Sequence, residues 1–148
     1  MNAVALVPTV SVRREIAAPA AELFDAWLDP GKLAAWMRPF DTERSDVKLD
    51  ARVGGAFEIV MHTPGGPVAH RGVYTAIERP HRLAFTWNSP YAGDHDSRVT
   101  VEFRPAGKST EVVLTHERLP RVHAAAHEGG WTDALRHLDE YRAPAHAG

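Results

Sequence analysis

The chain has 148 residues, of which 44% are hydrophobic and 24% are charged, and its formal net charge at pH 7 is −2. This length fits one domain with a real core, and the balanced charge, without a block of Lys or Arg, argues against nucleic acid and membrane surfaces as partners. The absence of cysteine excludes disulfides, thiol nucleophiles and thiolate metal sites. No stretch is apolar for long enough to span a membrane, and the first ten residues lack a signal-peptide pattern, so we expect a cytoplasmic protein.

The first expected strand covers residues 9–16. Its apolar residues alternate and so share one face, and Arg14 falls on that same face. A buried Arg needs a partner, and Glu58 or Glu117 would qualify only with a shifted strand register. Two alternatives therefore stay open, a buried ion pair or an Arg14 side chain that extends to the rim.

Two short helices are predicted next, over residues 18–28 and 29–36. Pro19 and Pro30 stand where proline suits the first turn of a helix. Asp29 is a good N-cap for the second helix, and Pro39 marks its end.

Six further strands are predicted between residues 42 and 117. They cover residues 42–49, 56–63, 68–77, 83–87, 98–104 and 110–117. Short turns join most of them, so neighbouring strands are expected to be antiparallel.

The hairpin around Pro64-Gly65-Gly66-Pro67 sets the expected register of two of these strands. A four-residue loop there pairs Thr63 with Val68 and Phe57 with Tyr74. Tyr74 and Ile77 differ in parity, so a β-bulge near residue 75 or 76 is needed to keep both side chains inward.

The longest helical pattern covers residues 124–142, after Pro120 and before Pro144. His127, Trp131, Leu135, Leu138 and Tyr141 recur at three- and four-residue spacing and so share one face. Gly129-Gly130 lies inside this pattern at a cost of about 1 kcal/mol per Gly relative to Ala. We expect the pair to kink the helix or to let backbone or ligand approach closely.

These elements predict an α+β fold. A seven-stranded antiparallel sheet wraps around a long C-terminal helix, and two short helices follow the first strand. We expect residues 1–148 to form a single domain with its core at about residues 9–142. One helix cannot fill a strongly twisted sheet, so a cavity between them is expected, and solid core packing is the alternative.

The candidate ligand-binding residues share an expected inward orientation. They are Trp36, Phe57, Ile59, Met61, Tyr74, Phe85, Trp87, Val101, Leu114, His116, Trp131 and Leu135. Apolar walls with a few polar groups are typical of a small-molecule pocket. His116 and Tyr74 are also the candidate proton-handling pair, against the simpler interpretation of His116 as a hydrogen-bonded core histidine.

Other chemistry has little support in the sequence. There is no Gly-x-Ser-x-Gly elbow, and no glycine-rich loop opens a helix. His62 and His70 flank the first hairpin but fall on opposite faces of the strand pair. Asp94-His95-Asp96 lies in one loop without a second ligand group. We therefore predict no functional metal and no cofactor.

A set of motifs occurs in a fixed order between residues 10 and 142. It includes Arg14-x-Ile-x-Ala-Pro19, Leu23-Phe-x-Ala-Trp27, Trp36-x-x-Pro39, Asp50-x-Arg-Val-Gly-Gly55, Pro80-x-x-Leu-x-Phe-Thr-Trp87 and His127-x-x-Gly-Trp131. The ordered set resembles the activator of heat-shock protein 90 ATPase homologue-like family, within the START-like or SRPBCC superfamily. The resemblance implies a helix-grip fold that holds hydrophobic ligands between its sheet and its C-terminal helix.

Three functions stay open under this resemblance. The preferred one is binding of a small hydrophobic or aromatic molecule in a stress-response or metabolic context. The second is a cyclase-, aromatase- or hydrolase-type enzyme using the same cavity. The third is a protein-interaction module, either a chaperone cofactor or a homodimer. We do not carry over the ATPase activation that gives the family its name, because we expect no room in this chain for the extra chaperone-binding domain of the larger eukaryotic co-chaperone.

Overall fold

The structure is a computed structural model that describes residues 6–7, 9–90 and 96–142. Its helices are α1 (Ala20–Leu28), α2 (Pro30–Trp36) and α3 (Arg121–Arg142). Its main strands are β2 (Val10–Ile16), β3 (Arg44–Leu49), β4 (Ala56–Thr63), β5 (Gly66–Glu78), β6 (Arg82–Trp87), β7 (Ser97–Ala106) and β8 (Ser109–Glu117).

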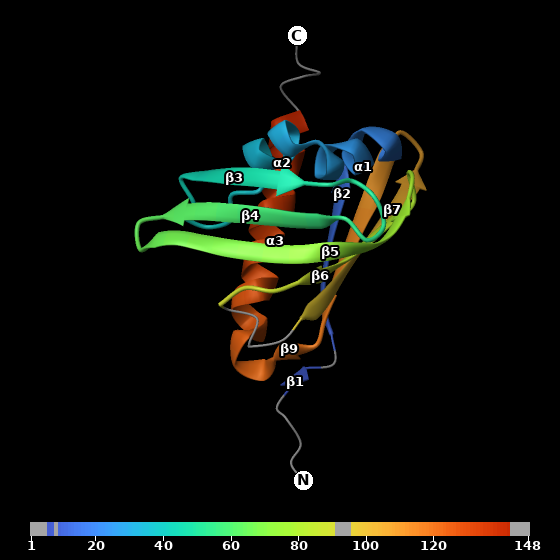
Figure 1. The fold of residues 1–148 in the computed structure, drawn as a ribbon. Helices are drawn as coiled ribbons and strands as arrows, with labels where there is room; N and C mark the ends of the chain where they lie inside the picture. Colours follow the sequence, from blue (N-terminus) through green and yellow to red (C-terminus); the bar gives the residue numbers. More distant parts are fainter. Residues whose placement is uncertain (1–5, 8, 91–95, 143–148) are drawn as a thin grey trace.

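These seven strands form one antiparallel sheet in the order β2-β8-β7-β6-β5-β4-β3. The sheet curves around α3, and α1 and α2 lie together at one end of it (Figure 1). The predicted α+β architecture is therefore confirmed. A small second sheet pairs β1 (Leu6–Val7) with β9 (Leu119–Pro120). It was not predicted, because two-residue strands are too short to show alternation.

Helix α2 begins as the sequence predicts. The Asp29 side chain accepts a hydrogen bond from the Lys32 backbone N–H at 3.0 Å, and Pro30 occupies the first turn. This satisfies one of the N–H groups that a helix start leaves without a partner. The helix ends before Pro39, so the chain leaves it as a loop that runs over residues 37–43 to β3.

The predicted register of the β4–β5 hairpin was wrong by two residues. Thr63 pairs with Gly66 and Phe57 with Gly72, so the loop is the two residues Pro64 and Gly65. Gly66 adopts a φ of 115°, a conformation that glycine reaches without steric cost, and this allows the tighter turn. A shift of two residues leaves every side chain on its predicted face.

The expected β-bulge is present in β5. The pairing with β6 shifts between Tyr74 and Ala76, which keeps Tyr74 buried and Ile77 packed against the core. Residues of α3 complete this core, and Ala134, Leu135 and Leu138 are fully buried. The helix and the curved sheet together thus enclose one apolar interior.

Arg14 has a partner that the sequence did not suggest. Its Nε lies 2.9 Å from Oδ2 of Asp139 on α3, whereas Glu58 pairs with Arg71 and Glu117 approaches Arg98. The Arg14 side chain is 37% exposed, so the ion pair lies at the rim, between the edge strand β2 and the helix. The identity of this partner depends on the rotation of α3 against the sheet, which strand alternation cannot supply.

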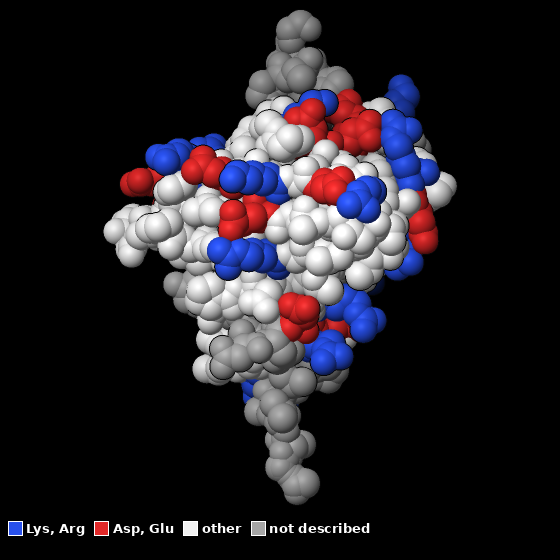
Figure 2. Space-filling view, viewed as in Figure 1, with Lys and Arg blue, Asp and Glu red and all other residues white. Residues whose placement is uncertain are grey.

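The outer side of the sheet is charged but mixed in sign. Basic and acidic side chains are interspersed over the face of the molecule seen in Figure 2. Lys48, Glu58 and Arg71 lie beside one another on β3, β4 and β5, and exposed pairs of this kind contribute less than about 1 kcal/mol each. Within the described residues, no helix is both long enough and apolar enough to cross a membrane.

Candidate functional site

A cavity of about 300 Å³ lies between α3, the loop that follows α2, and strands β4 to β6. Its size falls at the lower end of the range for small-molecule pockets. Its walls are mostly apolar. They are formed by Met37, Pro39, Phe40, Asp41, Thr42, Met61, Thr63, Val68, His70, Trp87, Ala126, His127, Gly130, Trp131 and Ala134.

Two buried tryptophans contribute to this lining. Trp87 comes from β6 and Trp131 from α3, and their rings lie 4.9 Å apart at an interplanar angle of 57°. Both side chains are less than 5% exposed. The two rings therefore meet at an angle and form a corner of the cavity where α3 faces the sheet.

A chain of hydrogen bonds holds this corner in place. The Trp131 Nε1–H donates to His116 Nδ1 at 2.9 Å, and the Ser97 hydroxyl donates to the Trp87 carbonyl oxygen at 2.7 Å. His116 Nε2 lies 2.7 Å from the same Ser97 oxygen, so this nitrogen must carry the ring proton and donate it. The chain links α3 to β8, β7 and β6 and fixes His116 as the Nε2–H tautomer.

The structure does not bring His116 and Tyr74 together. Burial, together with the nearby His127, lowers the pKa of His116 to about 3, and both of its ring nitrogens already have partners. Tyr74 pairs with Phe85, Phe85 with Val99 and Val99 with His116, so the backbones of Tyr74 and His116 are three strand spacings apart, about 14 Å along the sheet. Burial also raises the pKa of Tyr74. The structure therefore supports the simpler interpretation of His116.

His70 supplies a second buried imidazole, in the wall itself. Its ring lies 5.0 Å from that of Trp87, and burial lowers its pKa to about 4. Within the described part of the chain, His70 Nδ1 and Trp87 Nε1 have no hydrogen-bond partner. Burial also lowers the pKa of His127, so the imidazoles of the lining are uncharged at neutral pH.

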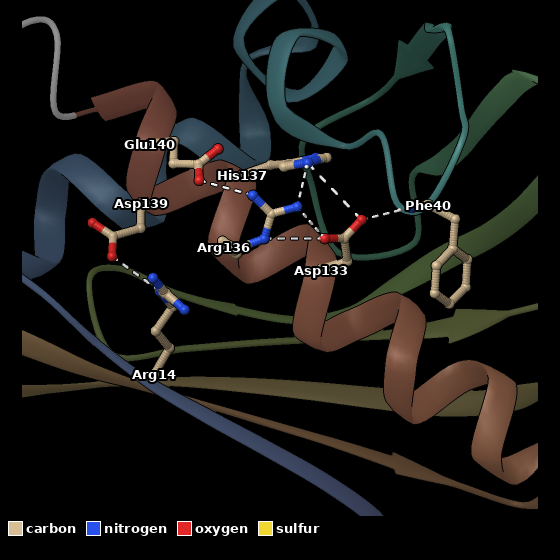
Figure 3. Close-up of polar contacts among 7 residues, drawn as sticks. All are labelled: Arg14, Phe40, Asp133, Arg136, His137, Asp139 and Glu140. Atoms are coloured by element: carbon tan, nitrogen blue, oxygen red, sulfur yellow. Dashed lines mark hydrogen bonds and ion pairs between the residues drawn. The ribbon is translucent and has the colours of Figure 1, made fainter.

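The loop after α2 closes one side of the cavity. Within it, the Thr42 hydroxyl donates to the Pro39 carbonyl oxygen at 2.7 Å and forms a turn. Phe40 has a φ of 57°, a left-handed conformation that costs a non-glycine residue about 1–3 kcal/mol. Its backbone N–H donates to Asp133 Oδ2 at 2.6 Å (Figure 3), and a hydrogen bond to a carboxylate contributes about 1.5–3 kcal/mol. The energetic cost of the left-handed conformation and the stabilisation by the hydrogen bond to Asp133 are therefore of similar size.

The Phe40 ring lies on the Gly129-Gly130 pair of α3. A methyl group at Gly129 would come within 3.2 Å of Phe40 Cζ, and one at Gly130 within 3.5 Å of Phe40 Cε2. The helix continues through both glycines from Arg121 to Arg142. A side chain, the Phe40 ring, therefore approaches this pair closely, where backbone or a ligand was expected.

The candidate ligand-binding residues divide into three groups. Met61, Trp87 and Trp131 line the cavity. Phe57, Ile59, Tyr74 and Phe85 surround, with Trp87, a void of only about 10 Å³. Trp36, Val101, Leu114, His116 and Leu135 are buried in the core and do not line the cavity.

One wall of the cavity, the loop that contains Pro39, Phe40, Asp41 and Thr42, was not predicted from the sequence. Strand and helix periodicity cannot place a loop against a cavity, and the signal that pointed toward it was the glycine pair on α3. No group of three His, Asp or Glu residues among those described could hold a metal ion. Asp94 and His95 of the acidic loop motif lie outside the described residues.

Comparison with known proteins places this chain in a family. The profile described as "Activator of Hsp90 ATPase homolog 1-like protein" matches residues 17–143. The uncharacterized protein C1711.08 of Schizosaccharomyces pombe is 29% identical over 121 residues, which cover 81% of this chain but only 32% of that protein. The chain thus spans about a third of the length of this curated relative.

Two solved bacterial structures share the fold. Protein CV1439 from Chromobacterium violaceum is 26% identical, with a TM-score of 0.77 and coverage of 89% of this chain and 94% of that one. The AHSA1-like protein from Aeromonas hydrophila is 27% identical, with a TM-score of 0.75 and coverage of 93% and 94%. The chain therefore belongs to the activator of Hsp90 ATPase homolog 1-like family, with the helix-grip fold of the START-like superfamily.

Proposed function

We propose that this protein binds a small, mostly apolar molecule that carries no negative charge. The observation that supports the proposal is the cavity between α3 and the sheet, with its corner of Trp87 and Trp131 and its two methionines. Burying the rings of a ligand against these walls supplies the affinity, at roughly 25 cal/mol per Å² of apolar area.

The charges around the cavity favour a neutral or cationic ligand. Its described lining contains no Lys or Arg, and its imidazoles are uncharged at neutral pH. Asp41, at the exposed rim, is the one charged side chain in that lining. An anionic group would lose its hydration there without gaining a counter-ion.

Binding is favoured over catalysis by the state of the buried histidines. His116 is occupied at both nitrogens, and the pKa values of His116 and His70 lie far below the range that suits a general base at neutral pH. We also propose a cytoplasmic location, which fits the absence of cysteine.

A pair of ligands matched in shape tests the proposal. 2-Acetylnaphthalene and 2-naphthoate differ mainly in charge, and both can be titrated while tryptophan emission is recorded. We expect saturable binding of the ketone with a dissociation constant in the micromolar range, about −8 kcal/mol, and at least about tenfold weaker binding of the carboxylate. Absence of saturable binding by the ketone would overturn the proposed function, and equal binding of both would overturn the charge preference.

A further inference from the structure

We propose that Phe40 is the gate of the cavity and that Asp133 holds it closed. The proposal rests on the ligand binding proposed above. Ligand would pass between the loop after α2 and the Gly129-Gly130 pair when Phe40 leaves its place on α3.

The first observation is the position of the Phe40 ring. It lines the cavity and is 62% exposed, so it lies at the boundary between the cavity and solvent. Gly129 and Gly130 lie against it, and a methyl group at Gly129 would already approach Phe40 Cζ to 3.2 Å. The ring is not among the residues of the buried core, so it can leave the helix without disturbing that core.

The second observation is the bond that keeps the loop on the helix. Asp133 reaches from α3 to the Phe40 backbone N–H, and Arg136 binds the other carboxylate oxygen (Figure 3). Burial alone would raise the pKa of Asp133, but the hydrogen bonds from Arg136 and Phe40 outweigh it, and the pKa lies below its usual value. The Asp133 carboxylate that holds the loop on the helix is therefore charged at neutral pH. Arg136 is held in turn by Glu140, with Nη1 2.8 Å from Oε2.

The third observation is the backbone of Phe40. Its left-handed φ of 57° is unfavourable for an aromatic residue and is imposed by the closed position. Opening would release this strain, so breaking one hydrogen bond suffices to change the balance between closed and open loop. A gate differs kinetically from a fixed wall, because easier opening raises the rates of association and dissociation together and leaves the dissociation constant unchanged.

Stopped-flow mixing with 2-acetylnaphthalene, followed by tryptophan emission, tests the gate. In Asp133→Ala we expect both rate constants to rise about tenfold, while the dissociation constant stays within about twofold of the parent. Gly129→Ala should act in the same direction, because its methyl group pushes the ring from the helix, although alanine is the better helix former. Thermal unfolding of each variant shows that the fold is retained.

Asp139→Ala is the matched control. Asp139 is also an acid of α3 paired with an Arg, but its partner Arg14 lies on β2, and neither residue lines the cavity. Its rates should equal those of the parent. Unchanged rates in both Asp133→Ala and Gly129→Ala would overturn the gate while leaving the proposed function standing. A dissociation constant that changes through the dissociation rate constant alone would also overturn the gate, because Phe40 would then be a fixed wall of the cavity. A parent protein that binds no ligand would overturn the proposed function and the gate together.

Discussion

At the scale of single residues, His116 connects the cavity to the fold. It contacts no cavity space, but it receives the indole hydrogen bond of Trp131 and donates to Ser97, which holds the strand that carries Trp87. His116 is thus a positioning residue. The low pKa of His116 keeps its ring neutral at neutral pH, and the neutral ring is needed for both hydrogen bonds.

Replacing His116 should therefore lower the free energy of unfolding by an amount that depends on the substituting residue. His116→Ala leaves the Trp131 indole N–H and the Ser97 hydroxyl without their partner and opens a small cavity, so the free energy of unfolding should fall by about 2–4 kcal/mol. His116→Asn places an amide oxygen near the position of Nδ1 and should retain the Trp131 bond, with roughly half that loss. Urea denaturation measures both. Equal losses in the two variants would contradict the role of the indole hydrogen bond.

The residues of the site were predictable only where they belong to regular elements. Met61 and Trp87 follow from strand alternation, and Trp131 follows from helical spacing. Phe40 did not, because its contact with the cavity depends on a left-handed turn after α2 and on a carboxylate 93 residues away. Neither feature leaves a periodic pattern in the sequence.

At the scale of elements, the two glycines of α3 and Gly72 of β5 serve different purposes. A Cβ at Gly130 would make only ordinary contacts with Phe40 and Pro39, at 3.5 and 3.9 Å, and this glycine lines the cavity. A Cβ at Gly72 would overlap the Thr86 carbonyl oxygen and crowd the Phe57 ring. Gly130 of α3 thus leaves open space in the cavity, and Gly72 of β5 allows close packing.

This contrast predicts opposite outcomes for two substitutions. Gly130→Leu should fill part of the cavity, keep the stability within about 1 kcal/mol of the parent and abolish binding of 2-acetylnaphthalene. Gly72→Ala should destabilise the protein by about 3 kcal/mol or more, because backbone must move to admit the methyl group. Chemical denaturation with parallel ligand titration distinguishes them. A Gly130→Leu protein that unfolds as readily as Gly72→Ala would contradict a cavity at α3.

The elements themselves were predicted well, because each carries its own local pattern. The bulge between Tyr74 and Ala76 followed from parity alone. The lengths of the tight hairpin loops did not follow from the sequence pattern. Gly107, with a φ of 68°, is the first residue of the two-residue loop between Ala106 and Ser109, so both strands extend beyond their predicted ends at residues 104 and 110. A glycine with a positive φ allows a two-residue loop, and the composition of a turn does not reveal the φ that its glycine adopts.

At the scale of the whole molecule, buried neutral histidines make the fold sensitive to acid. The folded-state pKa is about 4 for His70 and about 3 for His116, while both should be near 6.5 in the unfolded chain. Between these values the unfolded state binds more protons, so stability must fall as pH decreases from about 6.5 toward 4.

Each histidine can contribute a slope of up to about 1.4 kcal/mol per pH unit in that window. Urea denaturation at intervals from pH 7 to pH 4.5 should show this decline. His70→Phe should reduce the slope, because one buried imidazole is gone while His116 and the half-buried His127 still contribute. A stability that is constant over this range would contradict the neutral, buried state of both rings.

The central claim, that a small molecule occupies the cavity between α3 and the sheet, can be tested through the indole N–H signals of the four tryptophans. Trp87 and Trp131 line the cavity, whereas the Trp36 indole donates to the Ala26 carbonyl oxygen at 3.0 Å inside the core. Titration of ¹⁵N-labelled protein with 2-acetylnaphthalene should shift the Trp87 and Trp131 signals saturably and leave that of Trp36 in place. Signals that all stay in place, or that all shift alike without saturation, would contradict the claim.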